Sequence, residues 1–99
     1  MGWKIFDEAV EMIDRRFRYF PRVFRWRGHR YTVEAVERCW TVSRSGWKRR
    51  IERHYFLARC GEDAFELYQD VETGLWHLRR AKLISARITP VRDLAPAWR

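Results

Sequence analysis

The hydroxyl, carboxylate and imidazole side chains of this chain form no recognisable catalytic group. The serines, Ser43, Ser45 and Ser85, lie outside any GxSxG motif and have no obvious base beside them. Glu52 and His54 would share one face of a strand, where two exposed polar groups are a commoner explanation than an acid–base pair. The chain also lacks a glycine-rich phosphate loop. We therefore expect a binding module and not an enzyme.

Four side chains could ligate zinc, but their spacing does not favour a metal site. Cys39, the pair His54 and Cys60, and His77 fall in three different predicted strands. Structural zinc sites usually take ligands from tight knuckles such as C-x₂₋₄-C. We expect two reduced, buried thiols and two surface imidazoles, with no metal and no cofactor. A Cys39–Cys60 disulfide would need an oxidising compartment.

The strongest chemical signal is arginine interleaved with aromatic residues. Residues 15–30 contain seven arginines and no acid, and a second basic stretch surrounds Trp47. Guanidinium groups pair with phosphates and rings stack on bases, which is how many proteins bind single strands. The predicted nucleic-acid-binding residues are Arg22, Arg25, Arg27, Arg30, Trp47, Lys48, Arg49 and Arg50.

The net charge of +8 over 99 residues also favours a polyanionic partner. GC-rich codon usage is an alternative explanation, because arginine outnumbers lysine 18 to 3. Residues 61–78 have the opposite character, with five acids and no lysine or arginine. The amino terminus lacks the pattern of a signal peptide, and no apolar run is long enough to span a membrane. We expect a cytoplasmic protein.

The elements that must position these residues are mainly strands. Residues 22–35 predict a hairpin with a two-residue type II′ turn at Gly28-His29. In this register Trp26 faces Tyr31 and Phe24 faces Val33, so that one face is apolar. A bulge or bend is expected near residues 34–37, where the apolar phase changes.

Three further strands are expected at residues 51–60, 64–69 and 75–81. The segment at residues 4–17 is ambiguous, since its apolar residues have helical spacing but its shorter part at residues 9–13 would also suit an edge strand. The prediction is one domain over residues 1–99, with an irregular tail at 82–99. It is mainly β: a small, strongly curved antiparallel meander or barrel of about five strands, with or without a short N-terminal helix.

The motif W-x-G-x-x-Y-x-V, followed by a Trp, ELY-x-D and T-G-x-W-x-L, covers about residues 20–81. It resembles a family of small bacterial β domains of uncharacterised function, fused to or encoded beside Y-family translesion DNA polymerases. The matching residues are Trp26, Gly28, Tyr31, Val33, Trp40, Tyr55, Glu66, Leu67, Tyr68, Asp70, Thr73, Gly74, Trp76 and Leu78.

The resemblance implies a role in DNA damage tolerance, with DNA or the polymerase as partner, and it favours strand over helix near the amino terminus. We therefore expect nucleic-acid binding, accessory to translesion synthesis. The alternative is a protein-interaction module that docks on a polymerase or another partner through its acidic hairpin.

Overall fold

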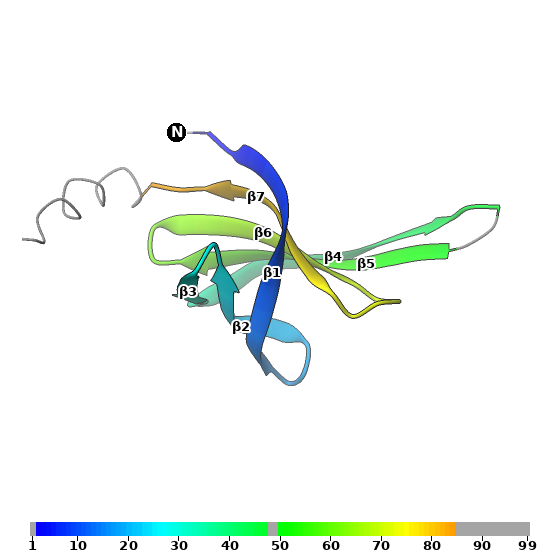
Figure 1. Cartoon of the computed structure of the whole chain (residues 1–99), viewed down its shortest axis with the longest axis horizontal. Coiled ribbons are helices and arrows are strands. Elements are labelled where there is room, and N and C mark those ends of the chain that lie inside the picture. Colours follow the sequence, from blue (N-terminus) through cyan, green and yellow to red (C-terminus); the bar gives the residue numbers. More distant parts are fainter. Residues whose placement is uncertain (1, 48–49, 85–99) are drawn as a thin grey trace, which may run out of the picture.

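A computed structural model describes residues 2–47 and 50–84, which form seven β-strands and no helix. The strands are β1 (Lys4–Arg16), β2 (Phe20–Trp26), β3 (His29–Thr32), β4 (Ala35–Ser45), β5 (Arg50–Cys60), β6 (Asp63–Asp70) and β7 (Trp76–Lys82). They form one antiparallel sheet in the order β3-β2-β1-β7-β6-β5-β4 (Figure 1). The predicted mainly-β antiparallel architecture is confirmed, with seven strands in place of about five and without closure into a barrel.

Strand β1 joins the two parts of the sheet because it pairs with two strands in succession. Its first half pairs with β7 and its second half pairs with β2. Phe6, Val10 and Met12 lie on one face of this strand and pack against the core. The N-terminal helix is therefore wrong, and the edge-strand alternative is wrong in placing this segment at an edge. Alternation with a period of two, and not the helical spacing, decides which residues of β1 turn inward.

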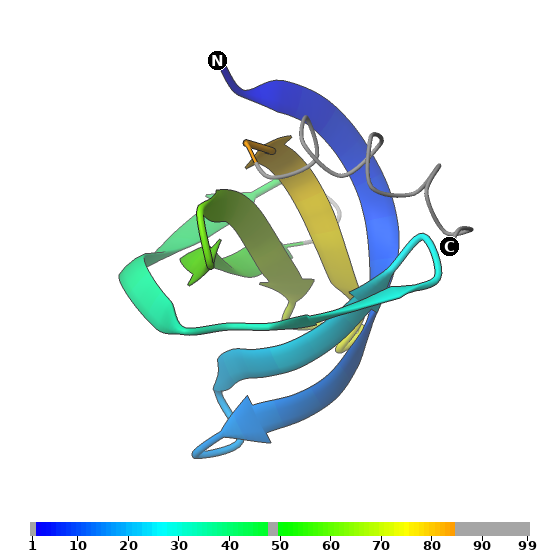
Figure 2. The ribbon, with the colours of Figure 1, turned by 90° about the vertical axis from the view of Figure 1, so that its left-hand side faces the viewer.

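The sheet curls so that its two ends approach each other (Figure 2). Strands β3 and β4 stand at opposite ends of the sheet order, yet only Val33 and Glu34 separate them along the chain. The Val33 amide donates to the Arg22 carbonyl of β2, and the Glu34 amide donates to the Arg59 carbonyl of β5, both at 2.8 Å. We call this meeting of residues 33–36 with residues 16–22 the seam. The bend predicted near residues 34–37 is confirmed, with a register shift between Val36 and Arg38.

The β2–β3 hairpin forms with a different register from the predicted one. Trp26 faces His29 and Phe24 faces Tyr31, so the turn consists of Arg27 and Gly28. Both turn residues have positive φ, 54° and 79°, as a type I′ turn requires. The register differs by two residues, which keeps the parity of the strand. For that reason Phe24 and Trp26 still point into the core.

The core lies on the concave face of the curled sheet. Phe24 and Trp26 of β2 contact Phe65 of β6, with ring centroids 5.3 and 6.2 Å apart. Trp26 and Trp76 are only 4% and 5% exposed, so the prediction that both rings are buried is confirmed. Phe56 stacks on Trp76 at 5.4 Å and also contacts Phe20 of β2 at 6.0 Å, which completes the contact between the two parts of the sheet.

Both thiols are free, as predicted, but their surroundings differ. Cys39 is exposed, so its expected burial is wrong. Cys60 is half-buried, and this burial raises the pKa of its thiol to about 12. Of the predicted irregular tail, Lys82 still belongs to β7 and residues 85–99 lie outside the described residues.

Candidate nucleic-acid interface

Three of the predicted phosphate-binding arginines are already paired with acids of β1. Arg22 bonds to Asp14 at 2.6 Å, and Arg25 bonds to Glu11 at 3.2 Å. Arg27 forms a two-pronged contact with Glu8, at 2.9 and 2.5 Å. The antiparallel pairing of β1 with β2 places Glu11 opposite Arg25. The Arg22–Asp14 and Arg27–Glu8 pairs follow on either side of it and complete the ladder. The formal charges of the three pairs cancel, which weakens the pull of this face on a polyanion.

Of the three ion pairs, the one between Arg27 and Glu8 has the most additional contacts. Trp26 donates its indole N–H to the same carboxylate at 2.9 Å. Hydrogen bonds from Arg27 and Trp26 hold the pKa of the Glu8 carboxyl below its usual value. The Arg27 guanidinium also lies over the rings of Phe6 and Trp26, at 5.0 and 4.9 Å. These contacts indicate a structural role for Arg27.

The other predicted residues are divided between two distant places. Arg30 lies exposed on β3 and has no carboxylate partner in the part of the chain that the structure describes. Trp47, 91% exposed, lies in the loop between β4 and β5. This hairpin extends to the right in Figure 1, away from β3 on the left. Arg50 contacts Glu52 at 3.7 Å and Ser43 at 3.3 Å. Lys48 and Arg49 lie outside the described residues. The predicted set is therefore not one continuous surface.

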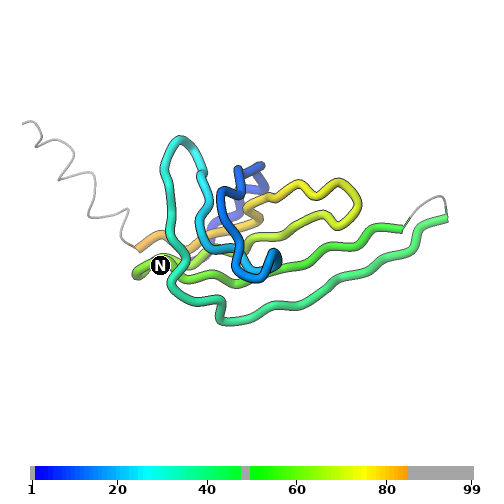
Figure 3. Tube along the Cα trace, turned by 90° about the horizontal axis from the view of Figure 1, so that it is seen from below, coloured from blue at the N-terminus to red at the C-terminus, as the bar shows by residue number. Residues whose placement is uncertain are grey.

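A different basic cluster lies at the end of β1 and in the loop that follows it. We call it the basic tip: Arg15, Arg16, Phe17 and Arg18. The Phe17 ring is 81% exposed, although phenylalanine is normally buried. Within residues 2–47 and 50–84, none of the three arginines forms an ion pair. The β1–β2 loop faces the viewer in Figure 3. The basic tip therefore combines uncompensated guanidinium groups with one available ring.

The backbone of the basic tip is in an unfavourable conformation. Phe17 and Arg18 both have φ of 56°, a region where residues other than glycine are uncommon. Each such residue costs about 1–2 kcal/mol. Tyr19 anchors the base of the loop, since its ring contacts His54 and Phe56 with centroids 5.3 and 5.2 Å apart. The Tyr19 contacts thus fix the base of the loop, while the Phe17 ring stays exposed. Packing of the core does not account for a strained backbone that exposes a phenylalanine.

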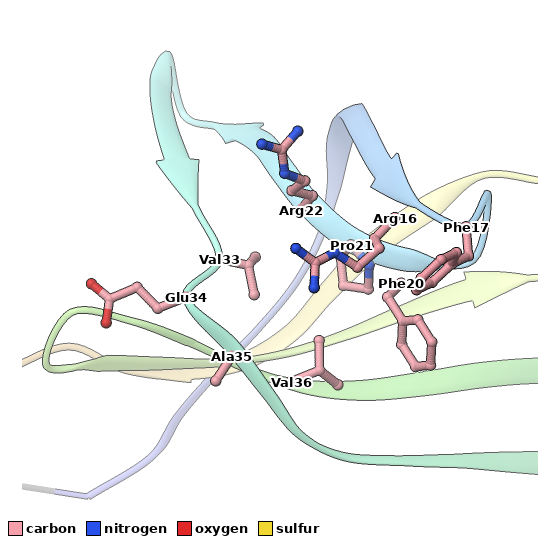
Figure 4. A pocket seen from close by; sticks show the side chains of 9 residues that line it. All are labelled: Arg16, Phe17, Phe20, Pro21, Arg22, Val33, Glu34, Ala35 and Val36. Carbon is pink, nitrogen blue, oxygen red and sulfur yellow. The ribbon is translucent and has the colours of Figure 1, made fainter.

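A groove of roughly 320 Å³ adjoins the basic tip at the seam (Figure 4). Its lining residues are Arg16, Phe17, Phe20, Pro21, Arg22, Val33, Glu34, Ala35 and Val36. The lining is mainly apolar, with two guanidinium groups beside it, as Figure 4 shows. The one carboxylate, that of Glu34, points away from the groove and bonds to Arg59 at 3.5 Å. A flat, partly apolar anion matches this combination of groups.

The convex face of the sheet carries a ladder of rings that the sequence analysis missed. Trp40, Tyr55, Tyr68 and His77 stack across four strands, with centroids 5.3, 5.2 and 5.0 Å apart. Arg53 lies 4.5 Å over the Tyr68 ring. Tyr55 and Tyr68 are only 9% and 6% exposed because neighbouring side chains cover them. The alternation R-x-W-x-V-x-R at residues 38–44 is the sequence signal for this face.

Within the described residues, Glu52 and His54 each have a different partner. His54 contacts the Thr41 hydroxyl at 3.0 Å, whereas Glu52 contacts Arg50, so the two do not form an acid–base pair. No three potential metal ligands gather in the described residues, and Cys39, His54, Cys60 and His77 are not brought together.

No protein-family model, curated protein or solved structure matches this chain. Within the described residues there is no helix that could cross a membrane.

Proposed function

We propose that this protein is a non-enzymatic module that binds single-stranded nucleic acid through the basic tip and the seam groove. One observation carries the proposal: Phe17 is 81% exposed between arginines that have no acid partner among the described residues. Guanidinium groups pair with the phosphate backbone, and an exposed ring stacks on an unpaired base. The net charge of +8 attracts a polyanion over longer range.

A single strand fits this site better than a duplex. The faces of the bases are available for stacking only where the strand is unpaired. The groove volume of roughly 320 Å³ lies at the lower end of the range for small-molecule sites, which suits one nucleotide. Phe17 would stack on a base, Arg16 would contact its phosphate, and Arg15 and Arg18 would contact neighbouring phosphates.

The role in translesion DNA synthesis is part of this proposal and rests on the sequence resemblance. A cytoplasmic location goes with it. Docking on a polymerase through the acidic hairpin is less well supported, because several of its acids are engaged within the fold. Glu66 is 4% exposed and bonds to Arg79 and Arg80. Asp63 accepts from the Ile84 amide, and Asp70 accepts from the amides of its own turn.

The first test compares two triple variants that lose the same charge. R15S/R16S/R18S removes the arginines of the basic tip, whereas R25S/R27S/R50S removes three arginines that are paired with Glu11, Glu8 and Glu52 and do not line the groove. Binding to a fluorescein-labelled oligothymidine is followed by anisotropy as salt rises. The slope of log K against log salt is about −0.7 per phosphate contact on a single strand. We expect the tip variant to reduce the steepness by roughly 1.4–2.1, equivalent to two or three contacts, and the paired-arginine variant to reduce it by less than one contact.

Phe17→Ala provides the second test of the proposed site. Loss of one stacked base costs about 1–3 kcal/mol while leaving the salt slope unchanged. Circular dichroism checks that every variant keeps the sheet. Equal effects of the two triple variants would disprove the assignment of the tip. Absence of binding by the wild-type protein at about 50 mM salt, where phosphate contacts are strong, would disprove nucleic-acid binding altogether.

A further inference from the structure

Strand β4 is an open edge of the sheet. Within the described residues it pairs only with β5, and its 11 residues make it much longer than β3, the four-residue strand at the other end. Along such an edge, alternate backbone amides and carbonyls point away from the sheet and remain available for another strand. In Figure 1 its outer half extends with β5 beyond the body of the molecule.

The side chains on the convex face of β4 form a regular pattern. Arg38, Trp40, Val42 and Arg44 alternate along the strand and face Leu57, Tyr55, Arg53 and Ile51 of β5. The Arg38 guanidinium lies 5.2 Å over the Trp40 ring. Val42 is 37% exposed. Neither Arg38 nor Arg44 has a carboxylate partner in the part of the chain described.

This pattern disfavours one obvious occupant of the segment at residues 38–44, which is the same segment of a second copy. Two copies paired antiparallel so that residues 38–44 overlap completely would centre on Thr41 and place Arg38 of each opposite Arg44 of the other. Like charges directly opposite each other destabilise a strand pair. An acidic strand reverses this effect, since its carboxylates would neutralise both arginines.

We propose that β4 binds an extended acidic peptide of a partner protein as an eighth strand. The peptide has carboxylates six residues apart, opposite Arg38 and Arg44, and two apolar residues between them, opposite Trp40 and Val42. Main-chain hydrogen bonds along the edge supply affinity, and the alternate side chains supply specificity. The order arginine, apolar, apolar, arginine reads the same in both directions, so the pattern accepts a parallel or an antiparallel strand. This surface is separate from the basic tip and goes beyond the proposed binding of nucleic acid.

The test uses a labelled peptide with the core Glu-Ser-Val-Ser-Val-Ser-Glu and the complete protein. We expect R38E/R44E to weaken binding roughly tenfold or more, and to bind the matching Lys-Ser-Val-Ser-Val-Ser-Lys peptide better than the wild type does. R15E/R18E is the matched control, which reverses the same number of charges at the basic tip. It should leave peptide binding unchanged while weakening binding to oligothymidine.

Backbone methylation distinguishes strand addition from simple charge attraction. N-methyl groups on one alternate set of peptide residues should abolish binding, and methyl groups on the other set should be tolerated. Equal tolerance of both sets would overturn the strand-addition model. Sedimentation of a dimer through β4 would assign the edge to a second copy instead. Loss of oligothymidine binding in R38E/R44E, together with displacement of the peptide by the oligonucleotide, would assign it to nucleic acid.

Discussion

At the residue scale, the position of an arginine decides what it can do. Arg22, Arg25 and Arg27 look alike in the sequence but lie beside acids of β1, whereas Arg16 and Arg18 do not. Exposed ion pairs contribute little to stability, so the pairs on β1 mainly limit the charge available to a partner. The aromatic residues divide in the same way. Trp26 is 4% exposed, while Phe17 is 81% exposed.

Trp26 is the residue with the most demanding surroundings. Its ring packs edge-on against Phe6 at 4.8 Å, and its N–H donates to Glu8. Trp26→Ala should cost about 3–5 kcal/mol, the range for emptying a large buried site. That is a large part of the roughly 5–15 kcal/mol available to a small domain. Urea unfolding measures the loss, with Trp47→Ala as the control because this ring is 91% exposed. Equal midpoints for the two variants would show that Trp26 is not part of the core.

At the element scale, the turn between β2 and β3 shows how neighbouring strands determine a local structure. Arginine is a poor residue for positive φ, and the sequence therefore favoured Gly28-His29 as the turn. In the structure, Glu8 and the rings of Phe6 and Trp26 hold Arg27 in this conformation. These residues lie on β1 and at the end of β2, so a local pattern could not reveal the choice.

Gly28→Ala tests the conformational requirement of this turn. A methyl group there would meet no atom within 4 Å, so any loss of stability must come from the φ of 79°. We expect a cost of about 1–2 kcal/mol, the penalty of an alanine in the left-handed region. Thermal melts should show this loss, while Gly2→Ala should melt like the wild type. An unchanged melting temperature for Gly28→Ala would mean that the turn adopts another register in solution.

The sequence predicted the strands that have strong alternation and clear turns. The segments at 51–60, 64–69 and 75–81 correspond closely to β5, β6 and β7. It did not separate β3 from β4, because the chain crosses between the two ends of the sheet in only two residues. The sequence predicted the types of residue in the candidate site but not their position in the structure. Arginine and aromatic residues do gather, yet the pairing with Asp14 and Glu11 depends on the position of β1.

At the scale of the whole molecule, the curled sheet has a buried centre around β6. The part of the β4–β5 hairpin that contains residues 41–45 extends from it, and we call this part the arm. Strand β6 lies between two partners, and Phe65, Glu66, Leu67 and Tyr68 are all buried. Strands β4 and β5 continue past this core, where residues 41–45 are exposed. The two proposed surfaces follow this division. The basic tip is anchored on the core through Tyr19, whereas the β4 edge lies along the arm.

Hydrogen exchange should reveal this gradient of stability. Amides open with free energies that range from near zero at exposed elements to the global value in the core. We therefore expect the amides of Phe65–Tyr68 to exchange slowest and those of residues 41–45 to exchange fastest among the strands. Mass spectrometry of peptic fragments measures both segments in one experiment. Addition of the acidic peptide should slow exchange in β4 and leave the basic tip unchanged, whereas oligothymidine should do the opposite. If β4 without a partner is as well protected as β6, its edge is not open, and the proposal of strand addition fails.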